Sequence, residues 1–300
     1  MQLVARLTST DLPVQDSFIP QLHSKSPRIM AILNITPDSF SDGGVFFHQK
    51  KIVIDRVVDV VATLQAEGAD IIDVGGESTR PGAEVVGVEQ ELERVVPVIE
   101  AIKARFDLPV SIDTSQPEVM LAATQAGASI INDVRALARP GALEAARRAV
   151  QNSGVMVCLM HMRGEPSTMN SLCRYENLVS DVLSELDERV NAAIEVGIPR
   201  SHLMLDPGFG FAKTTEQNFE LLAQLRQFQS RNMPILVGLS RKRMIGEVTG
   251  RPVFDRVVGS VVLAVMAMER GADIVRVHDV AATRDGLRLY RATCGLGFST

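Results

Sequence analysis

The segment Gly68-Ala69-Asp70-Ile71-Ile72-Asp73 occurs three times in the chain with small changes. Its later copies are Gly127-Ala128-Ser129-Ile130-Ile131-Asn132 and Gly271-Ala272-Asp273-Ile274-Val275-Arg276. In each copy the glycine follows a helical pattern, where a left-handed C-cap favours a residue without a β-carbon. The apolar residues after it have the length of a buried strand, and a polar residue follows them. The repeat therefore predicts helix–strand units that carry polar side chains at equivalent strand ends.

Eight apolar runs of strand length alternate with helical patterns along the chain. The runs are 29–33, 70–74, 109–112, 129–131, 155–160, 202–205, 234–239 and 273–277, and the helices are expected at about 50–67, 88–105, 116–126, 141–152, 176–196, 215–230, 254–270 and 283–293. Eight such units in about 250 residues predict an α/β fold, a closed (β/α)8 TIM barrel. The alternative is an open doubly wound sheet, but no G-x-G-x-x-G follows the first strand. Residues 28–300 are expected to form this single domain, after an irregular extension at 1–27.

The composition excludes several classes of protein. With 46% hydrophobic and 22% charged residues, the chain can bury a full core and is not of the disordered class. A net charge of −5 argues against a nucleic-acid partner, although the basic cluster at 241–243 can still bind a small anion. Three cysteines without metal-site spacing indicate a reducing, cytoplasmic compartment. No segment has the roughly 20 apolar residues of a membrane helix, and no secretory signal is evident.

The ends of the predicted strands carry carboxylates, amides and cations, and in a TIM barrel they all meet at one mouth. They include Asn34, Asp73, Asp113, Asn132, Asp133, His161, Asp206, Ser240, Lys242, Arg276 and His278, with Glu77-Ser78-Thr79-Arg80 after the second strand. Any one of them can be a helix cap or a loop hydrogen bond, and we expect that structural role for Asp133, Ser115 and Thr283. The group as a whole predicts a binding site at the mouth of the barrel.

Residues deep in this mouth suit a flat, nitrogen-rich heterocycle. Asp113, Asn132 and Asp206 offer acceptors and an amide to its N–H groups, and Lys242 can point at a ring carbonyl or nitrogen. The prediction from these residue types is therefore a polar floor that recognises a heterocycle.

Residues nearer the rim suit an anion. Arg276 and His278, on the last strand and before the last helix, have the donors that bind phosphate or diphosphate. The neutral oxygen of Asn34 suits Mg2+ that keeps most of its waters, and a simple turn residue is an equal alternative.

No side chain is a persuasive nucleophile. The chain has no G-x-S-x-G elbow, and Cys158 lies inside an apolar run that reads as core. His161, between two methionines, is as compatible with a structural role as with a catalytic one. Electrostatic positioning of a leaving group is thus favoured over covalent catalysis.

An ordered set of motifs over about residues 28–290 strongly resembles the dihydropteroate synthases, a family of pterin-binding enzymes. The motifs are Asn34-Ile-Thr-Pro-Asp-Ser-Phe-Ser-Asp42, Glu77-Ser-Thr-Arg-Pro-Gly82, Ser111-Ile-Asp-Thr114, Ile131-Asn-Asp133, Met160-His-Met162, Asp206-Pro-Gly-Phe-Gly-Phe211, Ser240-Arg-Lys242 and Arg276-Val-His-Asp279. Single motifs such as Asp-Pro-Gly are weak, but the ordered set is specific, and no core motif departs from the family pattern.

The resemblance implies a reaction of folate synthesis, in which 4-aminobenzoate displaces diphosphate from (7,8-dihydropterin-6-yl)methyl diphosphate and gives 7,8-dihydropteroate. It also implies residue roles. The residues implied to bind the pterin are Asp113, Asn132, Met160, Asp206, Phe211, Gly238 and Lys242, and those implied to bind the diphosphate are Thr79, Arg80, Arg276 and His278. The aminobenzoate would contact Phe40, Pro81 and Ser240, and Asn34 would bind Mg2+. The implied catalytic residues are Asp113, Lys242, Arg80 and Asp42.

The family mechanism is similar to an SN1 substitution, in which diphosphate leaves before the amine attacks. We expect the loops at 35–48 and 76–87 to close over the site, with Asp42 paired to Arg80. By resemblance we also expect a homodimer formed through outer helices, and sensitivity to sulfonamides as aminobenzoate analogues.

Two alternatives remain at this stage. A pterin-binding methyltransferase that uses methyltetrahydrofolate and a corrinoid shares the barrel, but it would not need Arg276, His278 or the Thr-Arg-Pro loop. A catalytically inactive homologue would be expected to have lost residues such as Asn34 or Lys242, which are present.

Overall fold

Eight parallel strands form the centre of the protein. The computed structural model describes residues 27–36, 46–48, 51–77 and 86–294. The strands are β1 (Arg28–Asn34), β4 (Ile71–Gly75), β5 (Val110–Asp113), β6 (Ile130–Asp133), β7 (Met156–Met160), β8 (Leu203–Asp206), β9 (Leu236–Val237) and β10 (Ile274–Val277). Each overlaps one of the eight apolar runs, so the predicted strands are confirmed.

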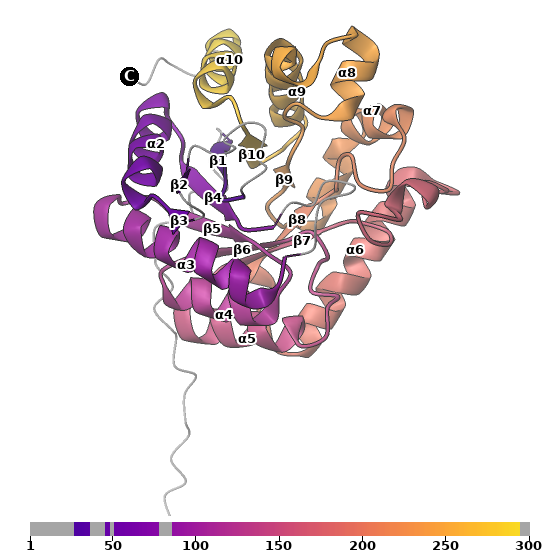
Figure 1. Ribbon diagram of the computed structural model, residues 1–300. Coiled ribbons are helices and arrows are strands. Elements are labelled where there is room, and N and C mark those ends of the chain that lie inside the picture. The colour runs from indigo at the N-terminus through magenta and orange to yellow at the C-terminus, as the bar shows by residue number, and fades with distance from the viewer. Residues whose placement is uncertain (1–26, 37–45, 49–50, 78–85, 295–300) are drawn as a thin grey trace, which may run out of the picture.

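The sheet curves into a nearly closed barrel. Its strands neighbour one another in the order β8-β7-β6-β5-β4-β1-β10-β9. The two end strands also meet, since the Leu205 N–H donates to the Pro234 carbonyl at 2.9 Å and Leu205 pairs in parallel with Ile235. The helices surround the strands (Figure 1). The predicted (β/α)8 barrel is confirmed, and an open doubly wound sheet is excluded.

The helices follow the strands in alternation. They are α2 (Ile54–Glu67), α3 (Val88–Arg105), α4 (Pro117–Gln125), α5 (Ala142–Ser153), α6 (Leu178–Glu195), α7 (Thr215–Ala223), α8 (Arg243–Thr249), α9 (Val257–Glu269) and α10 (Val280–Thr293), with short 3-10 helices at Met169–Ser171, Arg200–His202, Leu225–Arg231 and Val253–Asp255. Each of the eight expected helical stretches overlaps one of them, and α10 begins three residues before the expected 283. None of the described helices has the length and apolarity needed to span a bilayer.

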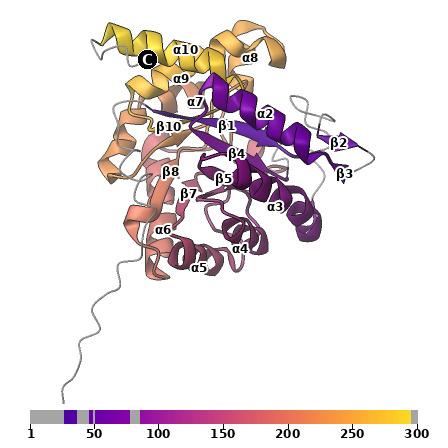
Figure 2. The same ribbon diagram turned by 90° about the vertical axis from the view of Figure 1, so that its left-hand side faces the viewer.

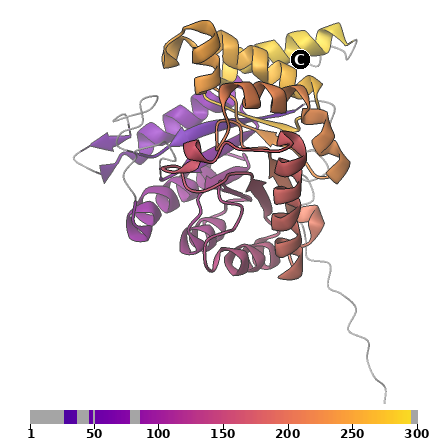
Figure 3. The same ribbon diagram turned by 90° about the vertical axis from the view of Figure 1, so that its right-hand side faces the viewer.

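Three details differ from the expected elements. The stretch 215–230 is α7 followed by a separate 3-10 helix, and the hairpin of β2 (Phe47–His48) and β3 (Lys51–Ile52) takes the place of the start of the helix expected at 50–67. Figures 2 and 3 show this hairpin projecting from one end of the molecule. The third is α8, whose seven residues bury only Met244 and Ile245, too few apolar positions for a periodicity to be recognised.

Two separate apolar layers explain why the strand ends become a site. Side chains outside the barrel pack against the helices, whereas a small inner cluster fills its lower part. That inner cluster comprises Met30, Ile71, Ile130, Met156, Cys158, Met204, Leu236 and Ile274. Strand side chains alternate between faces, so the residue two positions later points inward again, one layer higher. By this rule Ile71, Ile130, Met204 and Ile274 are followed by Asp73, Asn132, Asp206 and Arg276.

The repeated glycines have the predicted conformation. Gly68, Gly127 and Gly271 have φ angles of 101°, 111° and 94°. Gly68 also donates its N–H to the carbonyls of Leu64 and Gln65, which closes the end of α2. These caps turn each helix into the strand that follows it, and so set which residue reaches the mouth of the barrel.

Candidate active site

Arg276 lies at the centre of the barrel mouth, between two carboxylates. Its Nε is 2.6 Å from Asp73 Oδ2, and its Nη2 is 2.8 Å from Asp113 Oδ2. Asn132 Nδ2 approaches the same Asp73 oxygen at 3.5 Å. We expected Arg276 near the rim, but its inward position on β10 brings the guanidinium into the layer of floor carboxylates. Asp73, predicted only as one of the polar strand ends at the mouth, is fully buried there.

The floor carries more carboxylates than cations. Asp73, Asp113 and Asp206 face Arg276 and Lys242, so the five groups have an excess negative charge when all are ionised. Burial raises the pKa of Asp113 to about 7, although Arg276 opposes the shift. Such a site favours a ligand that offers N–H donors or develops positive charge.

Lys242 and Asp206 form the other side of the floor. Burial lowers the pKa of Lys242 to about 8 and raises the pKa of Asp206, and the two opposite charges partly offset both shifts. The ammonium of Lys242 donates to the carbonyl of Phe209 and lies 4.7 Å from the centroid of the Phe211 ring. The Gly208 N–H donates to Asp206 Oδ1 at 2.7 Å. The loop after β8 therefore positions several predicted pterin contacts at once.

Two further predicted contacts border this floor. Met160, 5% exposed, ends β7, and Gly238 follows β9. A β-carbon on Gly238 would meet only the Arg276 β-carbon, at 4.0 Å. The space beside Gly238, next to the stem of the Arg276 side chain, is therefore uncrowded among the described residues.

Ser240 and His278 are joined at the rim. The Ser240 hydroxyl oxygen accepts the His278 backbone N–H at 3.1 Å and lies 3.0 Å from His278 Nδ1. Next to them Arg241, with a φ of 56°, forms an ion pair with Asp279. This ion pair links the loop after β9 to the start of α10. It therefore holds together the segments that carry Ser240, the predicted aminobenzoate contact, and His278, the predicted diphosphate contact.

Asn34 is the predicted metal ligand, and it ends β1 beside Gly75 of β4. A β-carbon on Gly75 would lie 3.4 Å from Asn34 Oδ1, so glycine keeps the space around this oxygen free. No group of three or more His, Cys, Asp and Glu residues in the described part of the chain can hold a metal ion. The donor set therefore fits Mg2+ only if substrate phosphates and water supply most of its ligands.

Five predicted site residues lie outside the described residues. They are Phe40, Asp42, Thr79, Arg80 and Pro81. The expected pairing of Asp42 with Arg80 belongs to the same segments and stays a prediction.

Other polar residues near the mouth are structural. Asp133 accepts the backbone N–H groups of Arg135 and Leu137 at 2.9 and 2.7 Å, and it accepts the Ser115 hydroxyl. This confirms the structural role expected for Asp133 and Ser115. The hydrogen-bonded role expected for Thr283 is wrong, because its buried hydroxyl has no partner among the described residues. His161 is 3% exposed and bridges Glu185 and Lys213. The sequence analysis did not identify Lys213, whose only signal was its place two residues after the Asp206–Phe211 motif.

Comparisons with known proteins agree with this geometry. A family model described as pterin binding enzyme matches residues 30–278. Dihydropteroate synthase of Haemophilus influenzae is 48% identical over 267 residues, which cover 89% of this chain and 94% of the relative. The solved structure of Xanthomonas albilineans dihydropteroate synthase with 4-aminobenzoic acid has 48% identity and a TM-score of 0.81, covering 91% of this chain and 94% of that one. Its complex with 7,8-dihydropteroate has 46% identity and a TM-score of 0.78, covering 91% and 95%.

A TIM barrel with a buried, acid-rich floor and a match over most of its length defines a pterin-binding enzyme. Within that class, the chain belongs to the dihydropteroate synthase family. It is an enzyme of the transferase class.

Proposed function

We propose that this protein joins 4-aminobenzoate to the methylene carbon of (7,8-dihydropterin-6-yl)methyl diphosphate, forming 7,8-dihydropteroate and releasing diphosphate in folate synthesis. The relatives named above support this assignment, because one of them has been solved with 4-aminobenzoic acid and with 7,8-dihydropteroate.

The observation that carries the proposal is the buried floor in which Asp73 and Asp113 hold Arg276. In an SN1-like reaction the carbon–oxygen bond to diphosphate breaks first, and its electron pair leaves with the diphosphate. The methylene carbon is then positively charged, and the pterin ring shares this charge. A floor with excess carboxylate stabilises such a cation more than it stabilises the neutral pterin. The aminobenzoate nitrogen then forms the new carbon–nitrogen bond and releases a proton to solvent.

The pterin is bound by groups of complementary polarity. Asp113, Asn132 and Asp206 would take its N–H donors, and Lys242 would donate to a ring carbonyl or nitrogen. The uncrowded space beside Gly238 and the apolar groups of Met160 and Phe211 would accommodate the ring.

The remaining roles belong to the rim. We assign the diphosphate to Thr79, Arg80, Arg276 and His278, and the aminobenzoate to Phe40, Pro81 and Ser240, with Asp42 as the partner of Arg80. The hydrogen bond between Ser240 and His278 supports this assignment, because it places the aminobenzoate contact next to a diphosphate contact. As one end of Arg276 is occupied by floor carboxylates, its remaining N–H groups would serve the anion.

Asn34 would hold Mg2+ through its amide oxygen, with diphosphate and water completing the shell. When bound, Mg2+ supplies positive charge that stabilises the leaving diphosphate. The chain's own contribution is to place that oxygen next to Gly75, close to the floor on which the pterin would lie.

We further propose a cytoplasmic homodimer. The outer face of α9 exposes Val258 and Val262, at 76% and 51%, and α10 exposes Leu289 at 71%. Apolar side chains this exposed are well suited to burial against a second copy of the chain.

The test is an assay of the purified protein with the dihydropterin diphosphate, Mg2+ and 4-aminobenzoate. Diphosphate and dihydropteroate should form in equal amounts, and a chelator should stop both. Pterin binding without either product would refute the synthase proposal. Methyl transfer from methyltetrahydrofolate would then identify the protein as a methyltransferase. If no methyl transfer occurred, the protein would be an inactive homologue.

A further inference from the structure

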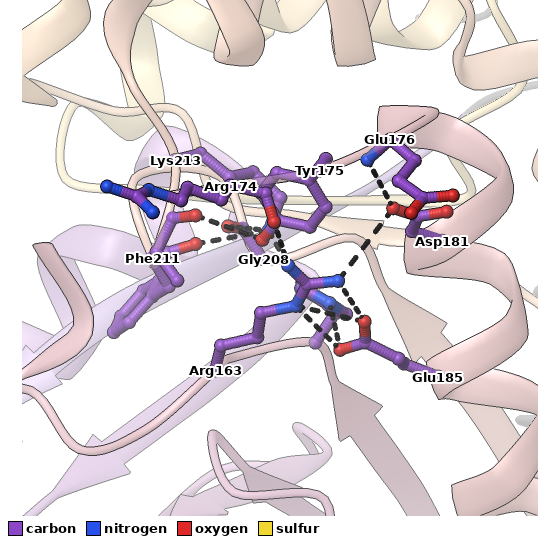
Figure 4. Close-up of polar contacts among 11 residues, drawn as sticks. Arg163, Arg174, Tyr175, Glu176, Asp181, Glu185, Gly208, Phe211 and Lys213 are labelled. Atoms are coloured by element: carbon purple, nitrogen blue, oxygen red, sulfur yellow. Dashed lines mark hydrogen bonds and ion pairs between the residues drawn. The ribbon is translucent and has the colours of Figure 1, made fainter. Parts of the chain in front are cut away.

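Lys213 is a buried cation for which the proposed reaction has no use. It lies between β8 and α7, and only 2% of its surface is exposed. Its Nζ lies 2.9 Å from His161 Nδ1, and 3.1 Å from each of the carbonyl oxygens of Gly208 and Phe211 (Figure 4). These three acceptors match the three N–H donors of an ammonium group. The ammonium form of the side chain therefore has an acceptor for each of its N–H groups. Burial opposes this charge and lowers the pKa of Lys213 to about 7.

His161 transmits this contact to helix α6. Because its Nδ1 accepts from Lys213, the imidazole is neutral, and its Nε2–H donates to Glu185 Oε2 at 3.0 Å. Burial lowers the pKa of His161 to about 4, in agreement with the neutral form. Lys213, His161 and Glu185 thus form a continuous chain, which we call the Lys213 chain.

A second contact runs parallel to the Lys213 chain. Arg163 donates to Glu185, and its guanidinium carbon lies 3.9 Å from the centroid of the Tyr175 ring. The Tyr175 hydroxyl donates to the Ala212 carbonyl at 2.9 Å. Figure 4 shows Arg163, Tyr175 and Glu185 together with the loop residues Gly208, Phe211 and Lys213. The loop at 207–213 is therefore connected to Glu185 of α6 by two routes.

This loop carries one side of the pterin floor. Gly208 donates to Asp206, the Phe209 carbonyl accepts from Lys242, and the Phe211 ring lies beside the Lys242 ammonium. Gly208 has a φ of 72°, and a β-carbon on it would lie 1.8 Å from the His161 carbonyl oxygen. The loop backbone is thus pressed against the end of β7, where a small displacement would move the floor contacts.

We propose that Lys213 is a positioning residue, which through the Lys213 chain sets the conformation of the loop at 207–213 and thereby the pterin site formed by Asp206, Phe211 and Lys242. This inference rests on the proposed function, because it assigns the site to a pterin. Lys213 acts through other groups and has no contact with the reacting atoms.

The charge of Lys213 has a separate consequence. The charged groups that face it are Asp206 on β8, Glu185 on α6, Arg163 after β7 and Lys242 after β9. Burial raises the pKa of Asp206, and the Lys213 charge opposes that increase. Replacing Lys213 by a neutral residue therefore makes Asp206 take up a proton at a higher pH. A protonated Asp206 is a poorer acceptor for pterin N–H groups.

The experiment compares the wild type with Lys213→Met, Lys213→Arg and Lys103→Met. Lys103 is the matched control, since its Nζ donates to the Leu108 carbonyl at 3.1 Å next to the start of β5, at the opposite end of the barrel. Binding of 6-hydroxymethyl-7,8-dihydropterin is measured by calorimetry from pH 5.5 to 8.5, together with the KM for 4-aminobenzoate. Lys213→Met should raise the pterin Kd by about 10- to 100-fold and should change the aminobenzoate KM far less.

The pH dependence separates positioning from a general structural role. In Lys213→Met the loss of pterin binding at low pH should begin at a higher pH, whereas Lys213→Arg should keep the wild-type profile. A wild-type pterin Kd in Lys213→Met, or equal losses for both substrates with an unchanged profile, would overturn the inference.

A milder variant covers the case in which Lys213→Met does not fold. Glu185→Gln keeps an acceptor for His161 but removes the charge at the far end of the Lys213 chain. It should weaken pterin binding in the same direction by a smaller factor, and a wild-type pterin Kd in this variant would overturn the inference. A wild type that binds no pterin would instead refute the proposed function.

Discussion

Glu91 offers a direct test of the electrostatics beneath the barrel mouth. It lies in the first turn of α3 and is fully buried. Neither of its carboxylate oxygens has a hydrogen-bond partner among the described residues. Gly76 packs on it, as a β-carbon there would lie 2.9 Å from Glu91 Cγ. Burial raises the pKa of Glu91 from its ordinary value of 4.5 to about 7.

This shift makes stability depend on pH. Between pH 4.5 and 7 the folded protein keeps the Glu91 proton while the unfolded chain has lost it. The contribution of Glu91 to the unfolding free energy is therefore largest below pH 4.5 and falls as the pH rises through 7. The difference between the two pKa values corresponds to about 3 kcal/mol, of which about 2.5 kcal/mol is lost between pH 5 and 8.5.

Glu91→Gln removes the titration and keeps the shape of the side chain. Unfolding in urea, followed by circular dichroism, would give the stability difference between variant and wild type at pH 5 and 8.5. The variant should gain about 2.5 kcal/mol relative to the wild type between these two pH values. Glu93→Gln, at an exposed position of the same helix, is the control and should show no such gain. A stability difference that is the same at both pH values would refute the reasoning.

Three further results are expected. Asp113→Asn should lower kcat about 100-fold, because a neutral amide cannot stabilise the proposed pterin cation. The kcat/KM of the wild type should fall below pH 7, because Asp113 becomes protonated there. Steady-state kinetics that give an unchanged kcat for the variant would contradict this. Asn34→Ala should raise the Mg2+ concentration for half-maximal activity by about tenfold, and an unchanged Mg2+ titration would remove Asn34 as the ligand. Val262→Glu should convert the proposed dimer to a monomer, since Val262 is 51% exposed on α9 and the variant places a charge there. A dimer mass in sedimentation would argue for another interface.

The fold could be read from local patterns because its units are local. Each helix–glycine–strand unit contains its own cap and its own apolar strand, and the left-handed conformation of Gly68 is set by its neighbours in sequence. Alternation along a strand then decides which residues point inward, so Asp113 and Asp206 could be assigned to the mouth of a barrel from sequence position alone.

Pairing within the site could not be read in this way. Arg276 and Asp73 are 203 residues apart, and their contact depends on how β10 and β4 are placed on either side of β1. We expected Arg276 to lie at the rim, but the structure places its guanidinium in the floor, between Asp73 and Asp113. Lys213 was overlooked because a lysine after a loop motif reads as exposed, and only the packing of the loop against β7 and α6 buries it.

The sequence by itself determined the repeating units, the barrel and the chemical types of the residues at its mouth, since strand length, alternation and glycine caps are properties of neighbouring residues. The tertiary structure alone decided which carboxylate holds which cation, which groups are buried deeply enough for their pKa values to shift, and which histidine is structural. These depend on distances between elements far apart in the chain and on the removal of water around them, and neither is encoded in any single segment.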